Sequence, residues 1–326
     1  MYGKGDARTA INGIYFWIWN TTKMLQMVEW MHSYNLNKPD STKVKFYGFD
    51  MQFDKLAVPL VAEKLKQLDS NYYNTHFKAL ADFKTFDAAK LKFIKFSDKE
   101  ADSYKQLFID IDTYLNTQQT ALLKIFSTED IAYLKRDVRL LQQCLDYDIQ
   151  STHVAKAYLN QYNDVRDKYM AENIEWISNY EGPQSKMIVW AHNTHVDNRF
   201  MGAVLKKAYS DQYYIIGFDF NKGSFRARNL EDKSKVETLS VGNAWNGSSG
   251  DVFSRLNIPA FFIDMEKPVK TNSIAAPFFT KKRLQRIIGA EFSHNRELNF
   301  YFYAPLYDNY DGLIFVNSTT ATQANK

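Results

Sequence analysis

The stretch from Lys186 to Asp197, KMIVWAHNTHVD, constrains the fold of this chain more than any other. Its apolar run, Met187–Ala191, has the length of a strand and is too short for a typical helix, so it predicts a buried β-strand over Lys186–Trp190. Four polar residues, His192 to His195, follow directly where that strand would end. In open α/β sheets this carboxyl end is where ligands bind. The stretch therefore predicts an α/β fold with a candidate site at one strand end.

A second core strand is predicted at Val44–Met51, VKFYGFDM, which is rich in aromatic and β-branched residues and ends at the polar Asp50 and Gln52. We expect this strand and Lys186–Trp190 to be neighbours or to lie in one sheet. Further strands are predicted at Tyr213–Phe220, Ser224–Arg228, Ala260–Met265 and Gly312–Asn317.

Between these strands the pattern is helical from Asp54 to about Tyr180. Two capping boxes, Ser97 with Glu100 and Ser127 with Asp130, precede apolar stripes at helical spacing. Upstream, apolar residues from Ile11 onward predict one amphipathic helix that ends near Asn35. The fold class is therefore α/β, with a central mixed or mainly parallel β-sheet flanked by helices and a long helical insertion at about residues 54–180.

Composition excludes several classes of protein. The content of aromatic residues is 16%, which indicates a packed globular chain, and the net charge of +4 is too mild to indicate a nucleic-acid partner. A single cysteine, Cys144, rules out an internal disulfide and is expected to be a buried core thiol.

No stretch of the sequence approaches the about 18 apolar residues of a membrane span. The run Ile11–Trp19 lacks the small-residue cleavage site of a signal peptide. We expect a cytoplasmic protein without a membrane partner.

The histidine pair is the main candidate for chemistry, because the chain contains no GxSxG elbow, P-loop, HExxH or GxGxxG motif. If the strand turns straight into a helix, His192 and His195 share one face and could position a water, a leaving group or a metal. A purely structural role, in which they satisfy backbone groups, is also open. A zinc site would need further ligands, for which Asp50, Asp219 and Asp264 are the candidates if parallel strands gather them at one rim. We predict no metal and no cofactor.

Several strings together resemble the erythromycin esterase family, in the same order over most of the chain. The two specific strings are Phe46–Gln52 (FYGFDMQ) and Trp190–Val196 (WAHNTHV). The supporting ones are Phe16-Trp17-x-Trp19, Val28-x-Trp30-Met31 with Asn35, Arg166-Asp167-x-x-Met170-Ala171-x-Asn173, Met201-Gly202 and Tyr310–Phe315.

The resemblance implies a single domain over residues 1–326 that hydrolyses an ester or opens a macrolide lactone, a type of enzyme known from antibiotic resistance. In such enzymes a general-base histidine beside glutamates activates water. By position, His192 and His195 correspond to active-site histidines of the family, and Asn193, Tyr47, Asp50 and Gln52 are expected to bind the small-molecule substrate.

One departure from the family pattern is expected to matter. The family's base lies on a Gly-Glu-x-x-His-Gly type motif in an N-terminal strand, and that string does not occur here. The chain therefore resembles an N-terminally truncated member whose sheet lacks two strands and whose activity is impaired. Two alternatives are a catalytically inactive ligand-binding fragment and a metal-dependent hydrolase that uses His192 and His195.

Overall fold

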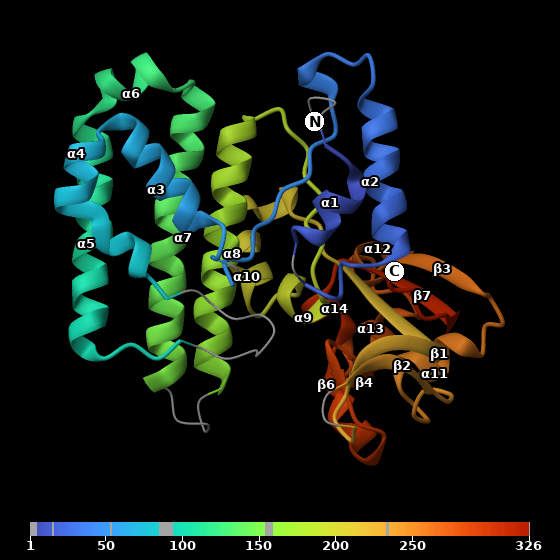
Figure 1. The fold of residues 1–326 in the computed structure, drawn as a ribbon. Helices are drawn as coiled ribbons and strands as arrows, with labels where there is room; N and C mark the ends of the chain where they lie inside the picture. The colour runs from blue at the N-terminus through green and yellow to red at the C-terminus, as the bar shows by residue number, and fades with distance from the viewer. Residues whose placement is uncertain are drawn as a thin grey trace. The chain divides into compact units, whose positions relative to one another are not determined.

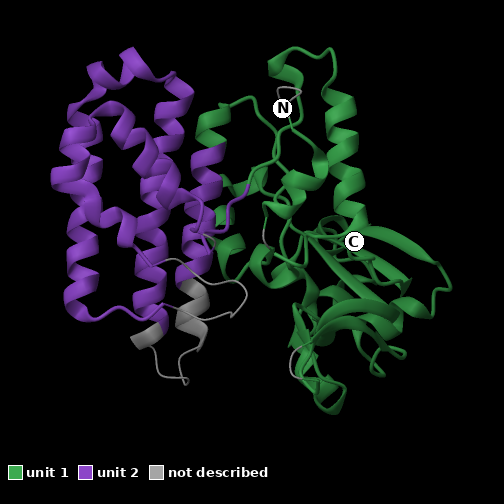
Figure 2. Ribbon diagram, viewed as in Figure 1, with its two compact units in different colours: residues 1–47, 178–326 green, residues 48–177 purple. Residues whose placement is uncertain are grey.

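The computed structural model describes residues 5–14, 16–52, 54–84, 94–153, 159–232 and 235–325. These form two compact units, of which unit 1 comprises residues 1–47 and 178–326 and unit 2 comprises residues 48–177 (Figure 2). Each unit is described by itself below. None of the helices that the structure describes is both long and apolar enough to cross a membrane.

The described residues of unit 2 form helices and helical turns joined by short irregular segments, without a strand, as predicted for the span 54–180; residues 85–93 and 154–158 of that span lie outside the described residues. Its elements are α3 (Ala57–Leu68), α4 (Ser70–Tyr72), the π-turn Tyr73–Phe77, the 3₁₀ turn Lys78–Asp82, α5 (Asp98–Thr117), α6 (Gln119–Ile125), α7 (Thr128–His153) and most of α8 (Leu159–Glu181) (Figure 1).

The helices of unit 2 pack around one apolar core. Its largest fully buried side chains include Phe77, Phe108 and Leu134, which come from three different elements. The predicted capping box at the start of α5 is present, because Ser97 accepts from the backbone N–H of Glu100 and Glu100 accepts from that of Ser97. Burial of the apolar stripe, with capped helix ends, is what stabilises this unit.

Unit 1 contains the sheets. Its strands are β1 (Ile216–Asn229), β2 (Lys235–Val241), β3 (Ala260–Asp264), β4 (Arg283–Arg286), β5 (Glu291–Phe292), β6 (Tyr301–Ala304) and β7 (Gly312–Thr319). The larger sheet has the order β2-β1-β7-β3, and β5 also pairs with β1; β4 and β6 form a separate ribbon (Figure 1). Since β1 is parallel to β7 and β5 while the β1–β2 and β3–β7 pairs are antiparallel, the sheet is mixed.

Helices flank this sheet. They are α1 (Ala7–Asn12), α2 (Thr22–Asn35), α9 (Asn193–Val196), α10 (Met201–Tyr209), α11 (Ser249–Ser254), α12 (Glu266–Lys270), α13 (Ala276–Thr280) and α14 (Leu306–Asn309), with 3₁₀ turns at Asp40–Thr42, Ser210–Gln212 and His294–Phe300. Phe253 of α11 covers one sheet face, with its ring 5.4 Å from that of Phe261 on β3 and 5.5 Å from that of Phe315 on β7. The fold class predicted from the sequence is therefore the observed one.

The expected single helix from Ile11 to Asn35 is wrong, because α1 ends at Asn12 and α2 begins at Thr22. The side chain of Thr21 accepts from the backbone N–H of Met24 and so caps α2. An N-cap residue has extended backbone and starts a new helix. The apolar residues keep their helical spacing between α1 and α2, so the sequence pattern does not reveal that the helix is interrupted.

The prediction of a strand at Val44–Met51 is also wrong, since this stretch is extended but not part of a sheet. Within each unit, side chains make the hydrogen bonds to this backbone that a neighbouring strand would otherwise make. The amide of Asn35 bonds both backbone groups of Val44, each at 2.8 Å. In unit 2, the side chain of Asn173 donates to the carbonyl oxygen of Phe49, and the thiol of Cys144 donates to that of Met51.

The strand predicted at Lys186–Trp190 is likewise absent from both sheets. The backbone is extended there, and Ile188 is 95% exposed. No described residue makes a backbone hydrogen bond to this stretch. An apolar run gives the tendency to form a strand, but a strand forms only where another strand pairs with it.

Candidate active site

The His-Asn-Thr-His sequence forms the short helix α9 and the residue that caps it. His192 is the N-cap, with extended backbone, and its carbonyl oxygen accepts from the backbone N–H of His195 at 2.9 Å. The two histidines therefore lie one helical turn apart, as their spacing predicts. In unit 1 this turn packs against β1 and α10.

Both ring nitrogens of His192 have partners. Nδ1 lies 3.3 Å from the backbone N–H of Thr194 and 2.9 Å from its hydroxyl oxygen. Nε2 lies 3.2 Å from the carbonyl oxygen of Ile288. Burial lowers the pKa of His192, the bond to Ile288 opposes this, and nearby His195 lowers it further. The ring of His192 thus links the turn to the loop that contains Ile288.

Asn193 fixes the same turn to the sheet. Its amide nitrogen donates to the carbonyl oxygen of Phe218 at 2.7 Å, and its amide oxygen accepts from the N–H of Phe218 at 3.1 Å. Both backbone groups of Phe218 therefore point away from β7, toward the open edge of β1. The predicted role of Asn193 in binding substrate stays a prediction, and the structure gives it a second role in the scaffold.

Residues just after the turn hold it from the other side. Asp197 is fully buried and forms an ion pair with Arg199, while the hydroxyl of Tyr213 donates to the carbonyl oxygen of Val196 at 3.0 Å. Gly202 lies so close that a Cβ there would be 2.0 Å from the carbonyl oxygen of Val196. The Met201-Gly202 string thus has a physical reason, because only glycine permits this approach of α10.

Tyr47, in unit 1, is anchored by a charged residue. Its hydroxyl donates to Glu181, which also accepts from Lys45 at 2.7 and 2.8 Å. Burial raises the pKa of Glu181, and its bonds to Lys45 and Tyr47 outweigh that effect, so the pKa is lowered overall. The assignment of Tyr47 as a substrate contact stays a prediction.

Asp50 and Gln52 belong to unit 2, and the structure shows a partner for each. Asp50 forms an ion pair with Arg166 at 2.7 Å, and Gln52 donates to the hydroxyl of Tyr147 at 3.0 Å. These contacts join the extended stretch of residues 49–52 to α7 and α8. Their predicted role in binding substrate is not tested by these contacts.

The conditional prediction that Asp50, Asp219 and Asp264 gather at one rim is wrong. Asp50 is on no strand, and β3, which carries Asp264, runs antiparallel to β7. Asp219 is buried beside the hydroxyl of Ser249, and burial raises its pKa to about 6. Asp264 accepts from the backbone N–H of Glu266 at 3.0 Å. Among the described residues, no cluster of three or more His, Cys, Asp or Glu has the arrangement of a metal site.

Sequence reasoning missed the partners of His192. Thr194 lies inside the recognised string, and a threonine two residues after a histidine that caps a helix is the signal that could have identified it. The other partner, Ile288, contributes only its carbonyl oxygen. No side-chain pattern reports a backbone acceptor, so no sequence signal for it exists.

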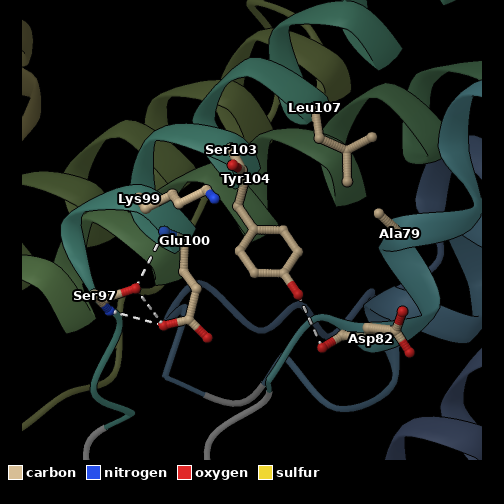
Figure 3. A pocket seen from close by; sticks show the side chains of 8 residues that line it. All are labelled: Ala79, Asp82, Ser97, Lys99, Glu100, Ser103, Tyr104 and Leu107. Atoms are coloured by element: carbon tan, nitrogen blue, oxygen red, sulfur yellow. Dashed lines mark hydrogen bonds between the residues drawn. The ribbon is translucent and has the colours of Figure 1, made fainter.

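A pocket of about 270 Å³ lies in unit 2, at the start of α5, and contains no histidine (Figure 3). Its lining residues are Ala79, Asp82, Ser97, Lys99, Glu100, Ser103, Tyr104 and Leu107. Its polar groups serve the fold: Ser97 and Glu100 form the capping box, and the hydroxyl of Tyr104 donates to the carbonyl oxygen of Asp82 at 3.0 Å (Figure 3). This pocket therefore adds nothing to the candidate site.

The chain is similar to known proteins over almost its whole length. A Bacillus subtilis (strain 168) protein named "Putative hydrolase YbfO" is 23% identical over 339 residues, which cover 96% of this chain and 71% of that protein. A crystal structure of a Bacillus cereus protein matches with a TM-score of 0.81 at 18% identity, covering 100% of this chain and 78% of that one. The crystal structure of a succinoglycan biosynthesis protein matches with a TM-score of 0.77 at 18% identity, covering 99% and 76%.

The two solved structures share the fold, and the Bacillus subtilis relative is named as a hydrolase. The family model for erythromycin esterase matches residues 1–319, which include the turn of His192 and His195 and both of the specific strings. The chain belongs to the erythromycin esterase family, and it is a hydrolase by that relationship.

Proposed function

We propose that this protein hydrolyses a carboxylic ester, most plainly a cyclic one such as a macrolide lactone, and that the His192–His195 turn is part of its site. The observation that carries the proposal is the turn itself. Its histidines lie one helical turn apart, and Asn193 and His192 attach it to β1 and to the Ile288 loop. A histidine held on a rigid support is what hydrogen bonding to a reacting ester requires.

The proposed chemistry is water attack on the ester carbonyl carbon. The water oxygen forms the new C–O bond while its proton passes to a general base, and negative charge develops on the carbonyl oxygen. The bond from carbon to the leaving oxygen then breaks, and that oxygen takes up a proton; a lactone therefore opens to a single hydroxy acid. We assign His195 to the carbonyl oxygen, where a hydrogen-bond donor stabilises the developing charge.

The general base is proposed to lie on a Gly-Glu-x-x-His-Gly type motif, which the 326 residues do not contain. Positioned acid–base groups contribute about 10²- to 10⁴-fold in rate. We therefore expect at most trace esterase activity from these 326 residues, and much higher activity from an extended version in which a segment with such a motif is joined ahead of residue 1.

The test uses three esters: 4-nitrophenyl acetate, a small lactone and a fourteen-membered macrolide. Each is incubated with the chain as given and with the extended version, and products are followed by absorbance or mass spectrometry. Turnover by the extended version, lowered by His195→Ala with unchanged melting temperature, supports the proposal. Robust turnover by the chain as given would show that the base is misassigned, and no turnover by either version would overturn the function.

A second candidate is ligand binding without turnover, which the missing motif favours. Calorimetric titration of the macrolide into the chain as given separates the two. Binding with no product, in both versions, identifies a binding protein. The same assays with and without EDTA and added zinc test the metal-dependent alternative, which would require activity to follow the metal.

A further inference from the structure

The partners of His192 fix which of its nitrogens carries the proton. The backbone N–H of Thr194 can only donate, so the Nδ1 atom that it approaches at 3.3 Å must present a lone pair. The carbonyl oxygen of Ile288 can only accept, so Nε2, at 3.2 Å, must carry the hydrogen. Two obligate partners thus select the neutral Nε2–H tautomer. The hydroxyl of Thr194 is compatible, because it can donate to Nδ1 at 2.9 Å.

Protonation would break this arrangement. A hydrogen on Nδ1 would point at the N–H of Thr194, so the ring could no longer accept from that N–H and cap the first turn of α9. Burial lowers the pKa of His192, and the neighbouring imidazole of His195 acts in the same direction. An imidazole in this position is therefore poorly suited to exchange protons with a substrate.

The cap also determines where His195 lies. The carbonyl oxygen of His192 accepts from the N–H groups of His195, at 2.9 Å, and of Val196, at 3.3 Å. Turning the backbone at His192 would move both residues. We propose that His192 is a positioning residue that stays neutral. Its ring caps α9 and links this turn to the loop that contains Ile288, so that His195 is the imidazole of the pair that contacts the ester.

This inference rests on the proposed function for the ester contact, and it differs from a shared catalytic role for both histidines. Three variants separate the two contacts of the ring. His192→Asn keeps an acceptor near the Nδ1 position, His192→Gln keeps a donor near the Nε2 position, and His192→Ala keeps neither. The pH profile of kcat/KM is measured for each in the upstream-extended protein, with His195→Ala as comparison.

For a positioning residue we expect kcat/KM to fall less than about tenfold in His192→Asn and His192→Gln, and further in His192→Ala. The acid limb of the profile comes from the general base, so it should be unchanged in all three variants and in His195→Ala. If His192 exchanges protons in the reaction, all three variants should lose about 10²- to 10⁴-fold alike. An equal loss of that size, or an acid limb that disappears with His192, overturns the proposal.

Histidine-labelled protein provides a readout that needs no substrate. Nitrogen-15 spectra of the six histidines, assigned by the His192→Gln variant, report the tautomer and charge of each ring between pH 5.5 and 8.5. We expect His192 to stay neutral with its hydrogen on Nε2. An Nδ1–H tautomer, or protonation within this range, would overturn the assignment. A neutral Nε2–H ring in a protein that hydrolyses no ester would instead remove the proposed function and leave His192 as a structural tether.

Discussion

The side-chain amide of Asn193 pairs with both backbone groups of Phe218, at 2.7 and 3.1 Å, in the manner of a neighbouring strand. A side chain thus occupies the edge of β1 at the point where the histidine turn meets the sheet. One residue between His192 and His195 therefore determines how the turn is attached to β1. This has a measurable consequence for stability.

Replacing Asn193 with Ala should lower the free energy of unfolding by about 1–2 kcal/mol, since a net hydrogen bond contributes roughly 0.5–1.5 kcal/mol. Asn193→Asp should cost more, because a carboxylate oxygen would then face the carbonyl oxygen of Phe218. Urea titration followed by circular dichroism measures both. The control is Asn198→Ala, whose exposed side chain makes no hydrogen bond to the described residues. Equal stability of the Asn193 and Asn198 variants would contradict the attachment.

Gly202 gives a second prediction, about the support behind the turn. An added Cβ would lie 2.0 Å from the carbonyl oxygen of Val196 and 2.1 Å from that of Asp197, and neither is the end of a flexible side chain. Gly202→Ala should therefore lower the free energy of unfolding by about 1–3 kcal/mol, as overpacking does, although alanine is the better helix former.

The matched control for Gly202 is Gly242→Ala, where no heavy atom lies within 4 Å of the added Cβ. We expect that variant to unfold like the parent protein in the same urea titration. A Gly202→Ala protein as stable as the Gly242→Ala protein would show that α10 moves away at no cost.

The sequence predicted the parts of the fold that depend on local pattern. Strands β3 and β7 were predictable because apolar and β-branched residues fill short runs, and α5 because Ser97 and Glu100 mark its start. The two strands predicted at Tyr213–Phe220 and Ser224–Arg228 are one continuous strand, β1. Val44–Met51 has the same kind of composition, yet its backbone groups bond side chains such as those of Asn35 and, 124 residues from Phe49, Asn173. Composition does not distinguish these two outcomes, since both satisfy the same backbone groups.

The candidate site was predictable to a similar extent. The spacing of His192 and His195 placed both histidines on one turn, and the structure has them there. The partner of Nε2 of His192 was not predictable, because it is the carbonyl oxygen of Ile288, 96 residues away. The partners of Asp50 and Gln52 likewise come from α8 and α7, whose sequence distance from them hides the contacts.

Cys144 yields a prediction about reactivity. Its thiol is buried and donates to the carbonyl oxygen of Met51 at 2.7 Å. Burial, followed by the nearby carboxylates of Asp54 and Asp148, raises its pKa well above the ordinary value. Because the thiolate is the reactive form, the native protein should not react with 5,5′-dithiobis(2-nitrobenzoate) at pH 8, and one thiol per chain should react in urea. Rapid native labelling at the unfolded rate would contradict this.

The last prediction concerns pH and the helical unit. Asp148 is 3% exposed, and burial, with the neighbouring Asp54, raises its pKa to about 7. In the unfolded chain an aspartate titrates near about 3.9. Between these values the folded state binds more protons than the unfolded one, so the free energy of unfolding should fall as pH rises through this window, by at most about 1.4 kcal/mol per pH unit.

Asp137 has the same direction of shift, with a pKa raised to about 6 by burial, so its contribution fades above that pH. The interval from pH 6.5 to 7.5 therefore reports mainly Asp148. Hydrogen–deuterium exchange of α7 peptides, corrected for the intrinsic exchange rate, measures the local stability there. Asp148→Asn keeps an acceptor for the N–H of Ile94 and removes the charge, so it should abolish the slope and stabilise α7 at pH 7.5.

The control is Asp102→Asn on α5, because the side chain of Asp102 is 78% exposed. That variant should keep the full slope of the parent protein. If α7 loses protection equally with rising pH in the parent, Asp102→Asn and Asp148→Asn proteins, the proton is bound elsewhere. If Asp148→Asn lowers protection at pH 7.5, the carboxylate stabilises the folded unit in its charged form, which is the opposite of what its burial beside Asp54 predicts.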